Sequence, residues 1–166
     1  MKPKLYLETT IPSYLVARRS RDLRLAADQA STKEWWKEQR HDFELFVSEV
    51  VLDEVREGNA EMAAARLNEL RDISILGALP VAEELAEHLL RQSIVPPKAS
   101  ADAAHVALAA ANEMDYLLTW NCTHINNPFL RRRIEEVCGL SGLVCPVICT
   151  PHESMNQKYY EKRNLR

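Results

Sequence analysis

The sequence predicts an α/β domain built around a mainly parallel sheet. Short apolar segments of strand length alternate with longer segments of helical composition along the chain, and this alternation favours parallel strands joined by helices. The chain has 166 residues, of which 46% are apolar, enough for one domain whose core needs no disulfide or metal. We therefore expect a three-layer domain at residues 1–153, with about four or five strands between helices, and a charged tail at residues 154–166.

The first half of the chain opens with a short apolar strand, which ends at Glu8 and the nearby Pro12. Farther on, Ser48 is a good N-cap for a helix, and Gly58-Asn59 is a good end for it. The segment after that is rich in Ala, Leu, Met and Glu, the residues that favour helices. The expected elements of this half are a strand at 4–7, helices at 13–19 and 22–40, a strand at 43–47, helices at 48–57 and 60–71, and a strand at 73–76.

The second half contains the most apolar helix of the chain. A rigid connector, Val95-Pro96-Pro97-Lys98, precedes it, and Ser100 is placed to cap it. Because this alanine-rich helix is apolar on nearly every side, we expect it to be buried. The expected elements of this half are helices at 82–92 and 100–114, a strand at 116–119, a helix at 128–138 and a strand at 144–149.

Charge and glycine content exclude several classes of protein. Lysine and arginine total 21 and aspartate and glutamate 24, for a net charge of −3, which excludes a histone-like basic protein but leaves room for a local RNA-binding patch. The four glycines form none of the glycine-rich turns of dinucleotide oxidoreductases, P-loop enzymes or α/β-hydrolases.

The sequence also indicates a location. The first apolar run ends at Glu8, too early for the core of a signal peptide, and no segment approaches the roughly 18 apolar residues of a membrane helix. In such a chain the four cysteines are expected to be reduced thiols. We therefore expect a cytoplasmic protein with no membrane partner.

Two polar residues lie just beyond the carboxyl ends of predicted strands. Glu8 comes after the first strand, and Asn121 comes shortly after the strand at 116–119. The carboxyl ends of parallel strands share one edge of the sheet, where ligands bind. Each residue has a structural alternative: Glu8 could accept hydrogen bonds from the turn at Thr9 and Thr10, and Asn121 could form a turn.

Two further acids lie on helix faces where charge is unexpected. On a helical wheel Glu54 falls between Val50 and Val51, on the side facing the core, where a carboxylate is costly unless it is paired. Its structural alternative is a buried salt bridge or an exposed helix end. Asp102 lies in the first turn of the apolar helix, where the helix dipole alone would favour an anion. A buried helix start is also a suitable place for a metal ligand or a base.

Taken together, the segments that carry these residues resemble the PIN domain family, and the resemblance covers about residues 4–153. PIN domains are small α/β folds with a parallel sheet, and many are metal-dependent ribonucleases, including the VapC-type toxins of toxin–antitoxin pairs. The resemblance thus implies an endoribonuclease that hydrolyses RNA phosphodiester bonds. The segments that carry it are 5–11 (LYLETTI), 47–55 (VSEVVLDEV), 101–107 (ADAAHVA), 116–121 (YLLTWN) and 147–151 (VICTP).

The resemblance also implies roles for these residues. Glu8, Glu54, Asp102 and Asn121 would be the catalytic residues, gathered at one end of the sheet around Mg²⁺ or Mn²⁺, cations that prefer carboxylate oxygens. Glu8 and Asp102 are expected to bind the metal directly, and Glu54 to bind it or to orient the attacking water. The residues expected to support them by hydrogen bonds are Thr9, Thr119 and His124.

The sequence departs from the family pattern at two positions, because Glu8 and Asn121 stand where the family usually has Asp. Glu8 is longer by one methylene, so its loop must retract, and the neutral Asn121 weakens cation binding. His124 is a candidate to compensate as a ligand or a phosphate contact, and otherwise is a plain surface residue. The alternative function is therefore a catalytically weakened PIN-like module that binds RNA or a protein partner without cutting.

Other clusters give the expected partners. Arg18, Arg19 and Arg21 follow the Glu8 loop and are candidate contacts for an RNA backbone, although solvated arginines are the plainer alternative. We expect an antitoxin protein as a partner and a homodimer formed through the helices at 22–40 and 60–71.

A zinc site at Cys145, Cys149 and His152 is a third possibility, but the spacing lacks a Cys-x₂-Cys pair and favours ordinary thiols. His105 is expected to face a neighbouring helix.

Overall fold

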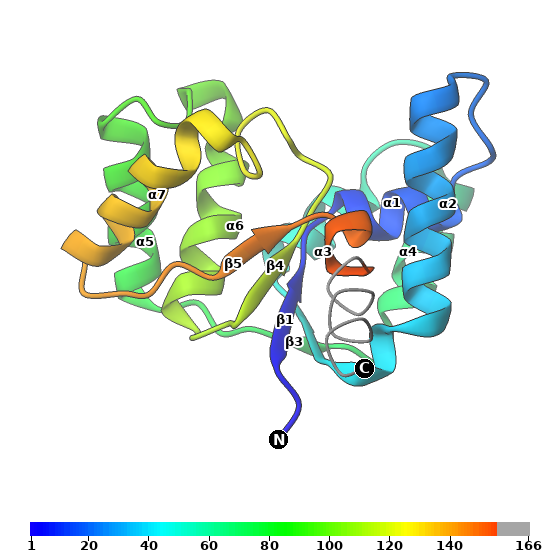
Figure 1. Ribbon diagram of the computed structural model, residues 1–166, viewed down its shortest axis with the longest axis horizontal. Coiled ribbons are helices and arrows are strands. Elements are labelled where there is room, and N and C mark those ends of the chain that lie inside the picture. Colours follow the sequence, from blue (N-terminus) through cyan, green and yellow to red (C-terminus); the bar gives the residue numbers. More distant parts are fainter. Residues whose placement is uncertain (156–166) are drawn as a thin grey trace, which may run out of the picture.

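The computed structural model describes residues 1–155 of the chain and confirms the expected three-layer α/β architecture (Figure 1). Within this part of the chain, five parallel strands form one sheet in the order β3-β2-β1-β4-β5. The charged tail expected at 154–166 lies outside the described residues from residue 156 onward. The strands are β1 (Lys4–Leu7), β2 (Glu44–Val47), β3 (Ser74–Ile75), β4 (Tyr116–Leu118) and β5 (Val147–Cys149).

Helices cover both faces of the sheet. In Figure 1, α5, α6 and α7 pack together on the left of the sheet, and α1, α2 and α4 lie on its right. The short helix α3 contacts both α4 and α6. The helices are α1 (Thr10–Val16), α2 (Leu23–Glu38), α3 (Glu49–Arg56), α4 (Ala60–Leu70), α5 (Pro80–Arg91), α6 (Ser100–Ala111) and α7 (Pro128–Leu140), with 3₁₀ turns at Arg40–Asp42 and Pro97–Ala99.

The central strand β1 explains why the sheet forms and where it ends. Leu5, Tyr6 and Leu7 are all fully buried, because β2 and β4 flank the strand and helices cover both faces. A continuous apolar run of this kind is typical of a parallel strand buried on both sides. Glu8 is the next residue, and its backbone N–H still bonds to Leu118 of β4 at 3.1 Å. The fold therefore fixes Glu8 at the carboxyl edge of the sheet.

The first helix begins earlier than the sequence suggested. It starts at Thr10 and not at residue 13, because both the backbone N–H and the hydroxyl of Thr10 donate to the Glu8 carboxylate. Pro12 does not stop the helix, since it lies in the first turn, where its missing N–H costs nothing.

The start of α6 also differs from the expectation. Ser100 is the first residue of the helix and not its cap, since its φ of −57° and ψ of −30° are helical. The 3₁₀ turn that begins at Pro97 leads directly into the helix, and the preceding Ala99 makes no side-chain cap. Asp102 remains in the first turn, as expected.

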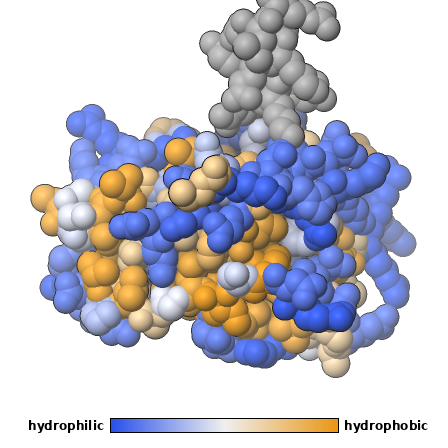
Figure 2. Space-filling model, turned by 90° about the horizontal axis from the view of Figure 1, so that it is seen from below, coloured by the Kyte–Doolittle hydropathy of each residue, from blue (hydrophilic) through white to orange (hydrophobic). Residues whose placement is uncertain are grey.

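The two ends of the sheet differ in character. Figure 2 shows the molecule from below, the side on which β1 begins in Figure 1, and hydrophobic residues gather at the lower centre and on the left of this face, with hydrophilic ones mainly on the right. The carboxyl edge, where Glu8 lies, is at the opposite end. None of the described helices combines the length and the apolar character needed to cross a bilayer.

Ser48 is the N-cap of α3, as expected, and its hydroxyl also lies against a buried side chain. Its replacement should therefore have a large effect on stability. Its Oγ accepts from the Val51 N–H at 3.4 Å and lies 2.7 Å from the buried Tyr6 hydroxyl. Replacing Ser48 by alanine should lower the free energy of unfolding by about 2 kcal/mol, from the lost cap and the lost buried hydrogen bond. Urea unfolding followed by circular dichroism measures this.

The matched control is Asn59→Ala, which removes an exposed cap of α4, whose oxygen accepts from Met62 at 3.1 Å. It should cost about 1 kcal/mol, a cap alone. Equal losses in the two variants would show that the contact between Ser48 and Tyr6 adds nothing to stability.

Candidate functional site

Glu8 is a buried carboxylate held through one of its two oxygens. Its side chain is 4% exposed, and Oε2 accepts from the Thr10 N–H at 3.0 Å, the Thr119 hydroxyl at 2.8 Å and the Thr10 hydroxyl. Among residues 1–155, no hydrogen bond to Oε1 is present. The structural alternative from the sequence is therefore correct in part, since the Thr10 turn does bind Glu8, but one oxygen remains available to a ligand.

Glu54 is placed by α3 and is also held through a single oxygen. It lies beside the buried Val51 and Val55, on the core-facing side that the sequence indicated. Its Oε2 accepts from the Thr9 hydroxyl and from Nε2 of His105, the latter at 2.8 Å. In the described part of the chain, Oε1 of Glu54 has no hydrogen-bond partner either.

These contacts decide the ionisation of Glu54. Burial alone would raise its pKa, but the hydrogen bonds from His105 and Thr9 and the nearby imidazole outweigh burial, so the pKa lies below its ordinary value. Glu54 is therefore a carboxylate at neutral pH, which is the form that binds cations and accepts protons.

His105 connects Glu54 to the interior of the sheet. The ring is fully buried, with Nδ1 lying 2.8 Å from the Tyr6 hydroxyl of β1. The Tyr6 hydroxyl in turn lies 2.7 Å from Oγ of Ser48, the N-cap of α3. One continuous chain of hydrogen bonds thus runs from the cap of α3, through β1 and α6, back to Glu54 on α3.

The donor and acceptor roles along this chain of hydrogen bonds follow from the Glu54 carboxylate at its end. A carboxylate only accepts, so Nε2 of His105 carries the proton that it donates to Glu54. In neutral histidine Nδ1 is then an acceptor, and the Tyr6 hydroxyl donates to it. Burial raises the pKa of Tyr6 far above its ordinary value, so its hydroxyl keeps this proton, and Ser48 donates to Tyr6. With a single proton on the ring, every member of the chain has a partner, and these contacts hold the Glu54 carboxylate in place.

A second chain of contacts joins the remaining predicted residues. The Asn121 N–H donates to the Thr119 hydroxyl at 2.8 Å, and the Asn121 side-chain oxygen accepts from the His124 N–H at 3.0 Å. Nδ1 of His124 lies 2.7 Å from the Asp102 carboxylate. Since Thr119 also donates to Glu8, the contacts run from Glu8 to Asp102 along the carboxyl edge of the sheet.

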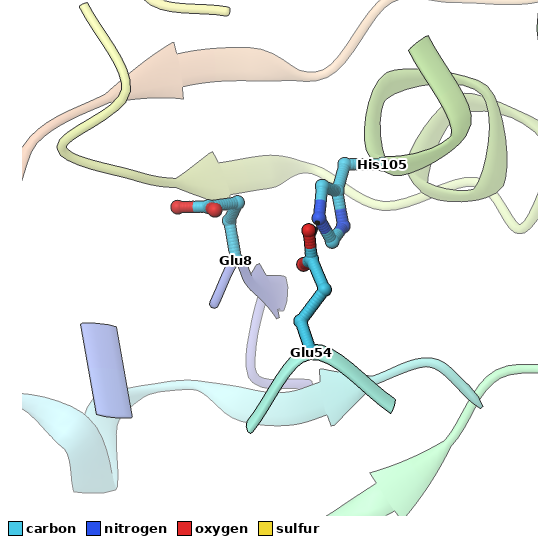
Figure 3. A group of neighbouring side chains, drawn as sticks. All are labelled: Glu8, Glu54 and His105. Atoms are coloured by element: carbon cyan, nitrogen blue, oxygen red, sulfur yellow. Dashed lines mark hydrogen bonds and ion pairs between the residues drawn. The ribbon is translucent and has the colours of Figure 1, made fainter. Parts of the chain in front are cut away.

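The two chains meet at a cluster of metal-ligating groups. Ligand atoms of Glu8, Glu54 and His105 all lie within 4.8 Å of one another. Figure 3 shows Glu54 and His105 facing each other from α3 and α6, with Glu8 beside them at the end of β1. Asp102 is not a member of this closest group, although it lies one turn before His105 on the same face of α6.

The donor set fits a divalent cation. No lysine or arginine in residues 1–155 forms an ion pair with Glu8, Glu54 or Asp102, so the closely spaced negative charges are balanced only by hydrogen bonds. Oε1 is open on both glutamates, and hard cations prefer such oxygens. Both nitrogens of His105 are already used, so His105 fits a positioning role better than that of a ligand.

The other residues predicted from the sequence lie outside the closest group of ligand atoms, and their places in the structure differ. Arg18, Arg19 and Arg21 are exposed in the segment between α1 and α2. Thr9 belongs to the site through Glu54. The side-chain oxygen of Asn121 is engaged in a turn, as its structural alternative anticipated, and His124 is not a plain surface residue, since it pairs with Asp102.

Sequence reasoning missed the part that His105 plays. The expectation that it faces a neighbouring helix is correct, since it contacts α3 through Glu54, but it also binds β1. The available signal was a histidine on the buried face of an alanine helix, three residues after Asp102. A buried polar ring needs partners, and Tyr6 was a polar group in a strand expected to be buried.

Comparison with known proteins bears on the fold. No family model matches the chain, and no curated protein matches it either. Among solved structures, the chain is similar to one in the crystal structure of VapBC2 from Rickettsia felis bound to a DNA fragment from their promoter, with a TM-score of 0.56 and 15% sequence identity. The match covers 88% of this chain and 97% of that one. This likeness shows the fold, and it agrees with the PIN-like architecture expected from the sequence motifs.

The contact between His105 and Glu54 predicts a change in titration. In His105→Leu, a donor to Glu54 is lost while burial remains, so the pKa of Glu54 in the metal-free protein should rise. A depressed pKa contributes stability that is present above the unfolded-state pKa and is lost as the pH falls through the folded-state pKa. The variant should therefore lose less stability on acidification through that range.

Carbon-13 NMR of the glutamate side chains, recorded against pH, measures this shift. The control is His105→Gln, whose amide can still donate to Glu54 and should keep the pKa closer to that of the native protein. Identical Glu54 titration in the native protein and the leucine variant would contradict the assigned hydrogen bond.

Proposed function

We propose that this chain is a cytoplasmic, metal-dependent endoribonuclease that hydrolyses RNA phosphodiester bonds and acts as the toxin of a toxin–antitoxin pair. The observation that carries the proposal is the group of carboxylates at the carboxyl edge of a PIN-like sheet, with open oxygens and no balancing lysine or arginine among the described residues. The fold similarity to a chain of the VapBC2 complex supports an antitoxin protein as the partner.

In this proposal Glu8 and Asp102 hold Mg²⁺ or Mn²⁺, with Glu54 beside them. The cation supplies positive charge that offsets the charge developing on the phosphodiester, and it makes water more acidic. Glu8 contributes through Oε1, because Oε2 is occupied by Thr10 and Thr119. Asp102 is oriented by His124.

Glu54 is proposed to orient the attacking water and to accept its proton. Thr9 and His105 fix one oxygen, so the other oxygen points in a defined direction, with no competing partner in the part of the chain that the structure describes. General bases of this kind work when their geometry is set in advance. Because its pKa is depressed, Glu54 is ready as the carboxylate at neutral pH.

The polypeptide around the site provides surfaces for the substrate and for a second copy. Arg18, Arg19 and Arg21 are exposed and follow α1, a helix about 10 Å long that begins beside Glu8. We propose them as contacts for the phosphates of RNA, which bind arginine strongly. Dimerisation is proposed through α2 and α4.

One observation favours a second candidate function, a PIN-like module that binds RNA or a protein without cutting. Asn121 is neutral where the family usually has an acid, and its side-chain oxygen already accepts from His124. It therefore adds no charge to the cluster. The retained carboxylates Glu8, Glu54 and Asp102 argue for the nuclease.

The test is cleavage of a mixed RNA pool with Mn²⁺ by the native chain and by Glu54→Gln and Asp102→Asn. Loss of a properly placed catalytic carboxylate typically costs 10²–10⁴-fold, so both variants should fall by about 10²-fold or more. The matched control is Asp53→Asn, on the same helix as Glu54 but exposed and, among the described residues, paired with Arg56 alone, and it should cut at the native rate.

The outcomes separate the two candidates. RNA binding by the native chain without cleavage at millimolar Mn²⁺ would favour the binding module. Equal cutting by the native chain and both acidic-site variants would show that the carboxylates do not carry the activity.

A further inference from the structure

A cavity of about 710 Å³ lies beside the candidate site. It is bounded by α2, by the segment after β4, by the start of α7 and by residues that follow β5. Its volume is in the range of small-molecule sites and exceeds what one nucleobase needs. Its lining includes Asp28 of α2, Trp120 and Asn126 after β4, Arg131 of α7, and His152 and Glu153 after β5.

One segment separates this cavity from the carboxylates. Asn121 and His124 form the contacts that lead to Asp102, whereas Trp120 and Asn126 of the same segment line the cavity. The Trp120 N–H donates to the Thr10 hydroxyl at 2.8 Å, and that hydroxyl donates to Glu8. A strand of RNA lying over the carboxylates can therefore place a neighbouring base in the cavity.

Trp120 gives the cavity a rigid aromatic wall. Its indole N–H donates to the Thr32 hydroxyl at 2.8 Å, and its ring is stacked on Tyr14, with centroids 6.1 Å apart and an interplanar angle of 16°. The ring is thus fixed from two sides before any ligand arrives. Aromatic side chains that are held in this way are the usual platforms for unpaired bases.

Two carboxylates, Asp28 and Glu153, give the cavity hydrogen-bond acceptors, and Arg131 and His152 line the same cavity as donors. Asp28 forms no side-chain hydrogen bond or ion pair with any residue of the described part of the chain. Glu153 accepts through Oε2, from the Thr150 N–H and Asn126, and within residues 1–155 its other oxygen has no hydrogen-bond partner. Burial raises the pKa of Asp28 above its ordinary value, as expected for a carboxylate that faces a partly enclosed space.

Carboxylate acceptors select among the four bases. Guanine presents two adjacent donors, N1–H and the exocyclic amino group, which match the two oxygens of one carboxylate. Adenine and cytosine each present one amino group. Uracil presents two carbonyl oxygens beside a single N–H, and a carboxylate repels those oxygens. A good bidentate contact discriminates between bases by roughly fivefold or more.

We propose that the cavity binds an unpaired RNA base carrying an exocyclic amino group, guanine fitting best, next to the bond that is cut, and that Asp28 selects this base. The inference rests on the proposed ribonuclease function and adds its substrate preference. Trp120 provides the stacking surface, and Asp28 provides the acceptor that reads the edge of the base.

The experiment cleaves a random-sequence RNA pool with the full-length chain and Mn²⁺, and then sequences the product ends. The native chain should favour guanine over uracil roughly tenfold at one fixed position beside the cut, the factor expected for one charged contact. Asp28→Asn turns an acceptor into a group that can also donate, so uracil should be accepted and the preference should fall to about twofold or less.

The matched control is Asp22→Asn, at the N-cap of the helix that carries Asp28. Asp22 caps α2 by accepting from Leu25 at 2.9 Å, asparagine caps equally well, and the position does not line the cavity. This variant should keep the native preference. Asp22→Asn should also leave the total cleavage of the pool unchanged, since Asp22 belongs neither to the cavity nor to the carboxylate cluster.

The outcomes distinguish a failure of this inference from a failure of the proposed function. Cleavage with no base preference, or with the same preference in Asp28→Asn, would overturn the role of the cavity while leaving the nuclease intact. If the native chain cuts nothing, titration with GMP and UMP decides: a shift of the Trp120 indole N–H signal by GMP, lost in Asp28→Asn, supports the base site, and no shift overturns it.

Discussion

The hydrogen bond between His105 and Glu54 links the buried centre of this protein to its polar edge. His105 is fully buried on α6, and Glu54 is half-buried on α3. The bond fixes the tautomer of the histidine, and the tautomer determines which way Tyr6 and Ser48 donate. Because Ser48 also caps α3, the helix that carries Glu54 and the orientation of its carboxylate are set by the same chain of contacts.

Charge is the second constraint on the carboxyl edge of the sheet. Glu8 and Glu54 approach each other closely, and in the described part of the chain neither acid is paired with lysine or arginine. Hydroxyl and imidazole donors occupy one oxygen of each acid and leave the other open. Groups held in this way cost stability unless a cation or a substrate balances them, and such arrangements are typical of functional sites. The fold thus keeps a local charge imbalance that its stability alone does not require.

Much of this arrangement follows from sequence. An apolar strand followed by Glu8, a serine cap before Glu54 and an acid in the first turn of an alanine helix are local patterns, and each is present in the structure. Fold class could be predicted because strand and helix periods alternate with little ambiguity. The start of α1 was misplaced because the residues from Glu8 to Pro12 were taken as the end of the strand, although proline is tolerated in the first turn of a helix.

The rest could not be predicted because it depends on contacts between distant segments. The bond from His105 to Glu54 joins residues 51 apart in sequence, and that from Tyr6 to His105 joins residues 99 apart. Asp102 pairs with His124 across 22 residues. No local pattern indicates which of several buried polar groups will meet. The same holds for the cavity beside Trp120, whose walls come from α2, from the residues between β4 and β5, and from the residues after β5.

The central claim is that the carboxylates at this edge bind one divalent cation. The most direct measurement is a crystal structure of the full-length chain soaked in Mn²⁺, with the ion located by its anomalous scattering. The account predicts one ion bound by Oε1 of Glu8 and the Asp102 carboxylate, beside Glu54, with His105 still bound to Glu54 and Tyr6. An ion bound to Nε2 of His105, or no ion at this edge at saturating Mn²⁺, would contradict it.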